Sequence, residues 1–145
     1  MPSDVALKGM NVVHRIITKV SFGKLGWSAA GMPVVELTTT GRKSGQRRSV
    51  MLTSPVQPSE GTWVLVASKG GEPEHPAWYL NLRDHPEVEI SVGGGPAQPM
   101  VARTAEGDER ARLWAELTAA QPRYAGYQRK TDREIPVVVV EPPAA

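Results

Sequence analysis

The alternation of hydrophobic and polar residues predicts six short strands along the chain. Within residues 48–55, Arg48, Val50 and Leu52 share one face, and we expect this face to point inward. Within residues 86–92, the same alternation predicts that Val92 points inward together with Val88 and Ile90. The six predicted strands are residues 33–37, 48–55, 62–68, 86–92, 98–104 and 135–140.

Two of these strands, residues 62–68 and 135–140, are apolar almost without interruption. Strands of this kind are usually covered on both faces, so we expect the last one to be central in a sheet. A Pro-Ser-Glu-Gly turn signal occupies residues 58–61 and leaves only a short link before the third strand. The short link predicts an antiparallel hairpin between residues 48–55 and 62–68.

Helical periodicity is clear near the N-terminus, over residues 4–25. An apolar stripe faces one way, and the cations Lys8, Arg15 and Lys19 lie on the opposite side. A basic amphipathic helix can lie in a membrane interface, but we favour packing of the stripe on the body of the protein. The stripe consists of Met10, Val13, Ile16, Ile17 and Val20.

Two further helices are predicted, one beginning near Pro76 and one that starts after Glu106 and ends before Pro122. The segment after Pro122 holds Tyr124 and Tyr127 and is too polar and broken to predict a regular helix. Six strands linked mostly by short turns, together with these helices, indicate an α+β fold with which a small β-barrel is compatible. We divide the chain into an N-terminal amphipathic helix, residues 1–30, and a strand-rich body, residues 31–145.

Composition narrows the class of protein. The 145 residues are 40% hydrophobic and 22% charged, which is typical of one globular domain with its own core. The net charge is only +2, so the basic character is local, and an extended nucleic-acid-binding surface is not expected. The absence of cysteine excludes thiol chemistry, and His75 and His85 lack a third ligand at a suitable spacing, so no metal site is expected. No signal peptide or membrane-spanning apolar run is recognisable, which predicts a cytoplasmic protein.

Candidate chemistry begins at residues 38–48, TTTGRKSGQRR, which follow the first predicted strand. Four cations, Arg42, Lys43, Arg47 and Arg48, lie close to hydroxyl groups, and the glycines allow backbone N–H groups to face a ligand. This composition suits a phosphate or a polycarboxylate, although a solvated basic turn has the same composition.

A second cationic glycine loop follows the third predicted strand, at residues 68–71 with the sequence SKGG. Lys69 and the backbone at Gly70 could converge there on an anion, as in the first loop. The predicted helix that follows carries Trp78 and Asn81 one turn apart, so both belong to one side of it. A lone Trp such as Trp78 is most often part of a core.

The ordered motifs LTTTGRKSGQ…R, ASKGG…P.WYLNL…HP, a Tyr pair and TDR.IP resemble the deazaflavin-dependent nitroreductase family, over about residues 33–142. These are reductases with a split β-barrel that use coenzyme F420. The resemblance implies cofactor phosphate and tail contacts at the two glycine loops, and it places two residues beside the deazaflavin ring. The implied loop residues are Lys43, Ser44, Arg48, Ser68 and Lys69, and the ring residues are Trp78 and Asn81.

One departure from the family pattern concerns Arg47, which occupies a position where the family usually has proline. This substitution either changes the turn or adds a cation for the cofactor tail. The resemblance also makes Tyr124 and Tyr127 candidate catalytic residues in the substrate pocket, whereas composition alone favours a packing role.

The implied activity is transfer of hydride from reduced F420 to a quinone, a nitroaromatic or an activated alkene. The expected partners are this small-molecule acceptor, a second copy of the chain in a homodimer, and peripheral membrane contact at the inner face. The alternatives are a split-barrel protein that binds FMN or haem, and a non-catalytic binder of F420 or of nucleic acid. Two localised loops, in place of a basic stripe interleaved with aromatic residues, argue against nucleic acid.

Overall fold

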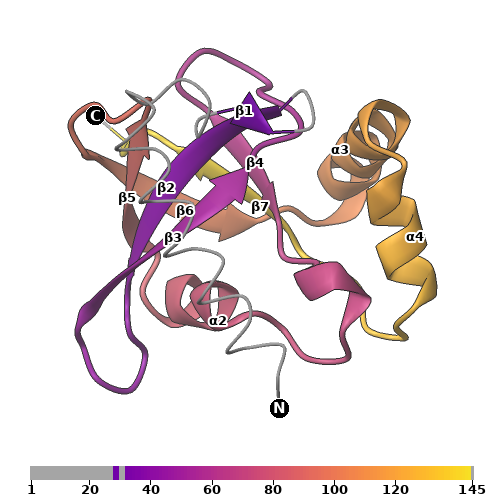
Figure 1. Ribbon diagram of the computed structural model, residues 1–145, viewed down its shortest axis with the longest axis horizontal. Helices are drawn as coiled ribbons and strands as arrows, with labels where there is room; N and C mark the ends of the chain where they lie inside the picture. The colour runs from indigo at the N-terminus through magenta and orange to yellow at the C-terminus, as the bar shows by residue number, and fades with distance from the viewer. Residues whose placement is uncertain (1–27, 30–31, 145) are drawn as a thin grey trace.

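The computed structural model describes residues 28–29 and 32–144. These residues form a curled antiparallel sheet with helices at its side and below it (Figure 1). The strand order is β1-β2-β5-β6-β7-β4, and β3 pairs with β2 off this path. The strands are β1 (Ser28–Ala29), β2 (Met32–Thr40), β3 (Arg47–Thr53), β4 (Trp63–Val66), β5 (Glu87–Val92), β6 (Gln98–Thr104) and β7 (Val137–Glu141).

Four helical segments complete the fold: the 3-10 turn η2 (Lys69–Gly71), α2 (Ala77–Asp84), α3 (Gly107–Ala120) and α4 (Arg123–Arg129). Figure 1 shows α2 below the curled sheet, and α3 and α4 together at one side of it. The N-terminal helix predicted at residues 4–25 lies outside the described residues. The predicted α+β class is confirmed by this arrangement, and the curled, open sheet agrees with the predicted split β-barrel.

Two hydrophobic clusters explain why β4 and β7 are apolar on both faces. Leu65 and Val138 face a cluster inside the curl of the sheet, which α2 closes. Val64 and Val139 face a second cluster, which α3 and α4 cover with Leu113, Leu117 and Tyr124. Each buried Val or Leu side chain contributes about 1.5–3 kcal/mol relative to an exposed one. The prediction that β7 is central is confirmed, because it pairs with β6 on one side and β4 on the other.

The predicted hairpin between residues 48–55 and 62–68 is wrong. β3 pairs with β2, whereas β4 pairs with β7. In the second pair, Trp63 lies opposite Val140, which is more than 70 residues further along the chain. No strand pairing joins β3 to β4. Instead, Ser54 just after β3 binds the backbone of β4: its Oγ donates to the carbonyl of Val64 at 2.8 Å and accepts from the N–H of Val64 at 3.2 Å. A buried serine therefore replaces strand pairing where the barrel splits.

Two local predictions also need correction. Val92 is 43% exposed and Ser91 is 8% exposed, so the inward alternation of β5 ends at Ile90. The reason is that β5 enters a tight turn, in which Ser91 Oγ donates to the carbonyl of Gly95 at 2.6 Å. The segment after Pro122 is the helix α4, because Tyr124 is buried at 6% exposure and the second cluster supplies apolar contacts that its sequence neighbours lack.

Candidate cofactor-binding site

The turn that joins β2 to β3 carries most of the predicted cations, and its own backbone holds it compact. The N–H of Gly41 donates to the carbonyl of Gln46 at 2.7 Å, and the N–H of Gly45 donates to the carbonyl of Gly41 at 2.9 Å. Gly45 has φ 71°, and a Cβ at Gly41 would lie 2.6 Å from Ser44 Oγ, so both positions favour glycine. The side chains exposed on this turn are Arg42, Lys43, Ser44 and Gln46.

Asn81 on α2 fixes this turn against the body of the protein. Its Oδ1 accepts the N–H of Arg42 at 3.0 Å, and its Nδ2 donates to Thr39 Oγ1 at 3.2 Å. Asn81 is 8% exposed and Thr39 is 1% exposed, so the bond between them is shielded from water, and the bond to Arg42 is partly buried. The amide therefore positions the basic turn, a role that its sequence position alone did not reveal.

Arg47 and Arg48 project from opposite faces of β3. Arg48 pairs in register with Thr39, whose hydroxyl is bonded to Asn81, so Arg48 is on the inner face beside α2. Arg47 pairs with Thr40, donates to its Oγ1 at 2.6 Å and forms an ion pair with Glu89 at 3.4 Å. The predicted inward face of Arg48 is confirmed, and Arg47 is separated from it by the sheet.

The SKGG loop follows β4 and forms the turn η2. Its backbone is left-handed over three successive residues, with φ 46° at Lys69, 64° at Gly70 and 85° at Gly71. The side chain of Lys69 is 3% exposed, and its Nζ lies 4.0 Å from Oε2 of Glu74. Ser68 is 9% exposed. In this conformation the ammonium group of Lys69 is paired, and the exposed surface of the loop is backbone at Gly70.

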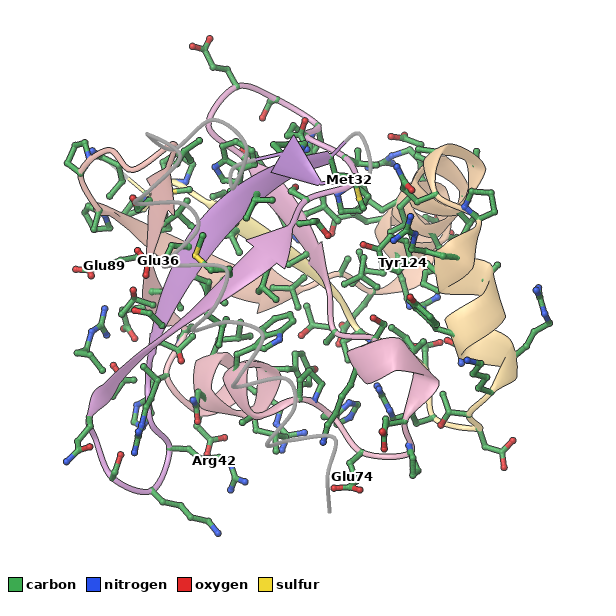
Figure 2. All side chains as sticks on the ribbon, in the orientation of Figure 1. Met32, Glu36, Arg42, Glu74, Glu89 and Tyr124 are labelled. Atoms are coloured by element: carbon green, nitrogen blue, oxygen red, sulfur yellow. The ribbon has the colours of Figure 1, made fainter. Side chains whose placement is uncertain are left out.

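Figure 2 shows Arg42 and Glu74, which mark the two loops, on the side of the molecule where α2 lies. Glu36 and Glu89 belong to β2 and β5 and lie away from α2 in the same view. The structure thus arranges the two cationic glycine loops around one helix. It leaves Arg47, bound to Glu89, outside that arrangement.

Trp78 and Asn81 share the buried side of α2, as their spacing predicts. Trp78 is 8% exposed and packs in the cluster inside the curl of the sheet. Its ring meets that of Tyr79 edge-on, with the centroids 6.5 Å apart. The indole is consequently part of the core under the loops, which agrees with the usual role of a lone Trp.

The two tyrosines of α4 occupy different environments. The Tyr124 hydroxyl lies 3.3 Å from Thr53 Oγ1 and 3.7 Å from Met32 Sδ, and Figure 2 labels Tyr124 beside α4 and Met32 near the start of β2. Burial raises the pKa of Tyr124, which makes its phenol a weaker acid. Tyr127 is half-buried, and the Nζ of Lys130 lies 5.7 Å from the centroid of its ring.

Arg133 is a site residue to which the sequence patterns assigned no role. It lies in the TDR.IP motif, between α4 and β7, and its guanidinium contacts the SKGG loop. It also donates to His75 Nδ1 at 3.1 Å if that nitrogen is the unprotonated one. Burial, then the charges of Arg133 and Arg83, lower the pKa of His75 and favour the neutral imidazole that this bond needs.

Residues 28–29 and 32–144, the part of the chain that the structure describes, contain neither a metal-binding cluster nor a membrane-spanning helix. In that part of the chain no group of three or more His, Cys, Asp or Glu could hold a metal ion. None of its helices is long and apolar enough to cross a bilayer.

A curled, split barrel with two cationic glycine loops beside one helix belongs to the class of proteins that can hold an anionic ligand at such loops. The chain belongs to the F420H2-dependent quinone reductase family, whose model matches residues 11–142. Family membership confirms the resemblance found in the motifs.

Individual relatives agree with this assignment. The chain is 38% identical to an F420H2-dependent quinone reductase of Mycobacterium tuberculosis (strain ATCC 25618 / H37Rv) over 134 residues, which are 88% of this chain and 87% of the relative. A solved F420H2-dependent reductase, FDR-A, is 46% identical, with a TM-score of 0.65 over 75% of this chain and 94% of that one. Another solved structure, described as a domain-swapped dimer, is 40% identical, with a TM-score of 0.68 over 92% and 99% of the two chains.

Proposed function

We propose that this protein is an oxidoreductase that binds reduced coenzyme F420 and passes its hydride to a quinone, a nitroaromatic or an activated alkene. The observation that carries the proposal is the bond from Asn81 to the basic turn, which holds exposed cations beside α2 in a protein of this family. A solvated turn would not require a buried amide to fix it. Cations held in advance lose less conformational entropy when an anion binds.

The residues fit a long anionic cofactor. Arg42, Lys43, Ser44 and Arg48 hold the phosphodiester, and the SKGG loop, with Ser68, Lys69 and Gly70, meets a further anionic part. Trp78, in the core under the loops, would support the floor beneath the ring, and Asn81 would hold the basic turn beside it. When bound, the reduced deazaflavin supplies the hydride, and the protein supplies orientation and exclusion of water.

The cofactor assignment predicts selectivity between two flavin-like molecules. F420 carries an acidic oligoglutamate tail that FMN lacks, and each added hydrogen bond between charged groups contributes about 1.5–3 kcal/mol. We therefore expect the purified protein to bind F420 at least about tenfold more tightly than FMN in a fluorescence titration at moderate salt. Equal or stronger binding of FMN would contradict the proposal, and binding of haem alone would assign the barrel to another cofactor.

Tyr127 is the better candidate for orienting or protonating the acceptor. The Tyr124 hydroxyl is enclosed by Thr53 and Met32, and burial raises its pKa, so it is poorly suited to donate a proton. Tyr127 is more accessible and lies on the helix that packs against η2. Tyr127→Phe therefore tests the hydroxyl at the more accessible ring.

We expect Tyr127→Phe to lower turnover of a quinone or nitroaromatic acceptor by on the order of 10²-fold, with F420 affinity unchanged, because general acid help is lost. Tyr124→Phe serves as the matched control and should lower mainly the free energy of unfolding, by about 1 kcal/mol, the net contribution of one hydrogen bond. Stopped-flow reduction and thermal denaturation measure the two effects. Parent rates in both variants would make the rings structural and the proton donor water.

We further propose a cytoplasmic homodimer with peripheral contact to the inner face of the membrane through residues 1–30. A dimer is supported by the domain-swapped relative, and the mass in solution, measured by light scattering, decides between monomer and dimer.

Membrane contact is supported by the basic amphipathic pattern that includes Lys8, Arg15 and Lys19. A chain that begins at Ser28, and so keeps β1, should still fold, and it should no longer sediment with anionic vesicles. Failure of this chain to fold would show that the apolar stripe belongs to the core.

A further inference from the structure

The conformation of the SKGG loop requires support from outside it. Lys69 has φ 46°, a value that residues with a Cβ rarely adopt, and two left-handed glycines follow it. Within the loop, the N–H of Gly71 donates to the carbonyl of Ser68 at 2.9 Å, and the N–H of Glu72 donates to the carbonyl of Lys69 at 3.1 Å, so these two bonds span a single turn. A strained backbone persists when the surrounding structure fixes it from several directions.

Arg133 supplies this support from a distant part of the chain. Its Nη2 donates to the carbonyl of Ser68 at 2.8 Å, its Nη1 to that of Ala67 at 3.2 Å, and its Nε to that of Glu72 at 2.9 Å. One planar guanidinium therefore binds two carbonyls just before the left-handed turn and one just after it. No single-point cation such as lysine can satisfy three carbonyls in this fork geometry.

The backbone that carries Arg133 is itself held in place. Gln128 of α4 donates through Nε2 to the carbonyl of Arg133 at 2.7 Å and accepts through Oε1 the N–H of Ile135 at 2.9 Å. The ring of His75 lies on the other side, at 3.1 Å from Nη1. Burial lowers the pKa of Arg133, but a guanidinium remains charged at every physiological pH. The contacts thus form a continuous connection from α4 to the loop.

The direction of these bonds has a consequence for the N–H groups of the loop. In a planar trans peptide, the C=O and the N–H of the same unit point in opposite directions. When the carbonyls of Ala67 and Ser68 point at Arg133, the N–H groups of Ser68 and Lys69 are turned away from it. Arg133 thereby selects the face of the loop toward which these donors point.

We propose that Arg133 is a positioning residue that holds the SKGG loop in its anion-binding conformation and thereby sets affinity for the cofactor. This inference rests on the proposed function, in which the loop meets an anionic part of F420. Arg133 acts through the loop backbone and is not assigned any contact with the cofactor. Its loss should therefore weaken cofactor binding while leaving the chemical step of the loaded enzyme nearly unchanged.

Two variants and one matched control test the proposal in the full chain. Arg133→Lys keeps the charge and removes the fork, and Arg133→Ala leaves space that free guanidinium can fill. Arg129→Lys changes an exposed arginine of α4 and is the control. We expect Arg133→Lys to raise the Kd for F420 about tenfold or more, because small misplacements of a binding group have large effects, with kcat at saturating F420 within about twofold. Millimolar guanidinium should restore affinity in Arg133→Ala, whereas ammonium at equal ionic strength should not.

Hydrogen–deuterium exchange of the cofactor-free protein separates this inference from the proposed function. Arg133→Lys should raise exchange in residues 67–75 and leave the turn at residues 41–46 unchanged. If exchange in residues 67–75 stays at the parent level, or if exchange rises and the Kd for F420 does not, Arg133 is not a positioning residue. A parent protein that binds no F420 would overturn the proposed function. In that case a rise in exchange with Arg133→Lys would still support the role of Arg133 in holding the SKGG loop, and unchanged exchange would overturn that role.

Discussion

Replacing Arg48 by Ala should raise the Kd for F420 by about 10- to 150-fold, the range that corresponds to loss of one hydrogen bond between charged groups worth about 1.5–3 kcal/mol. Lys43→Ala should have an effect of similar size. Both side chains are exposed on the segment that Asn81 holds beside α2, so nothing in the fold depends on their charge. We expect kcat at saturating F420 to change much less than the Kd, because the proposed function assigns these residues to the phosphate and not to the hydride.

Arg47→Ala is the matched control, since Arg47 is adjacent in sequence, has the same chemistry and projects from the opposite face of β3. Its partners are Thr40 and Glu89, and the ion pair is 46% and 43% exposed on its two side chains, so its contribution to stability is small. Fluorescence titration of the three variants should show weak binding for Arg48→Ala and Lys43→Ala and near-parent binding for Arg47→Ala. An equal loss for Arg47→Ala would indicate a general charge effect, and parent affinity in all three would restore the interpretation as a solvated turn.

Gly71→Ala should lower the free energy of unfolding by about 3 kcal/mol or more. A Cβ at Gly71 would lie 2.7 Å from the carbonyl oxygen of Tyr127 and 2.9 Å from Cβ of Lys130, at φ 85°. The left-handed conformation alone costs about 1–2 kcal/mol for a residue with a Cβ, and the contact with backbone of α4 adds to it. Gly71 thus lies against α4, whose Gln128 binds the backbone of Arg133, and Arg133 in turn binds the loop.

Gly70→Ala separates backbone strain from the clash. Gly70 has φ 64°, and no atom lies within 4 Å of the position of its Cβ, so only the conformational penalty of about 1 kcal/mol should appear. Thermal denaturation should give a drop in Tm of about 10 °C for Gly71→Ala and about a third of that for Gly70→Ala, at roughly 3 °C per kcal/mol for a chain of this size. Equal shifts would mean that α4 moves away freely and that the loop is not locked against it.

The sequence by itself determined the elements whose signals are local. Alternation along residues 48–53 and unbroken apolar runs in β4 and β7 predicted strands at those places, because successive side chains of a strand point to opposite faces, which one or two apolar layers can cover. Pro76 and Pro122 marked where helices begin and end, since proline cannot continue a preceding helix. The two glycine loops and the family were evident for the same reason, because their residues are contiguous.

Only the tertiary structure decided which elements meet. A short link predicted pairing of β3 with β4, yet β7 supplies the partner of β4, and no local pattern encodes a contact between residues as distant as Trp63 and Val140. Tyr124 lies in a helix because Leu113 and Leu117 of α3 share its cluster, which overrides the polar composition around it. Long-range polar contacts were equally invisible: Asn81 holds Arg42, and Arg133 holds Ser68, across separations of 39 and 65 residues. Such bonds depend on the three-dimensional packing of α2, α4 and the sheet, and a linear pattern of residue types carries no signal of them.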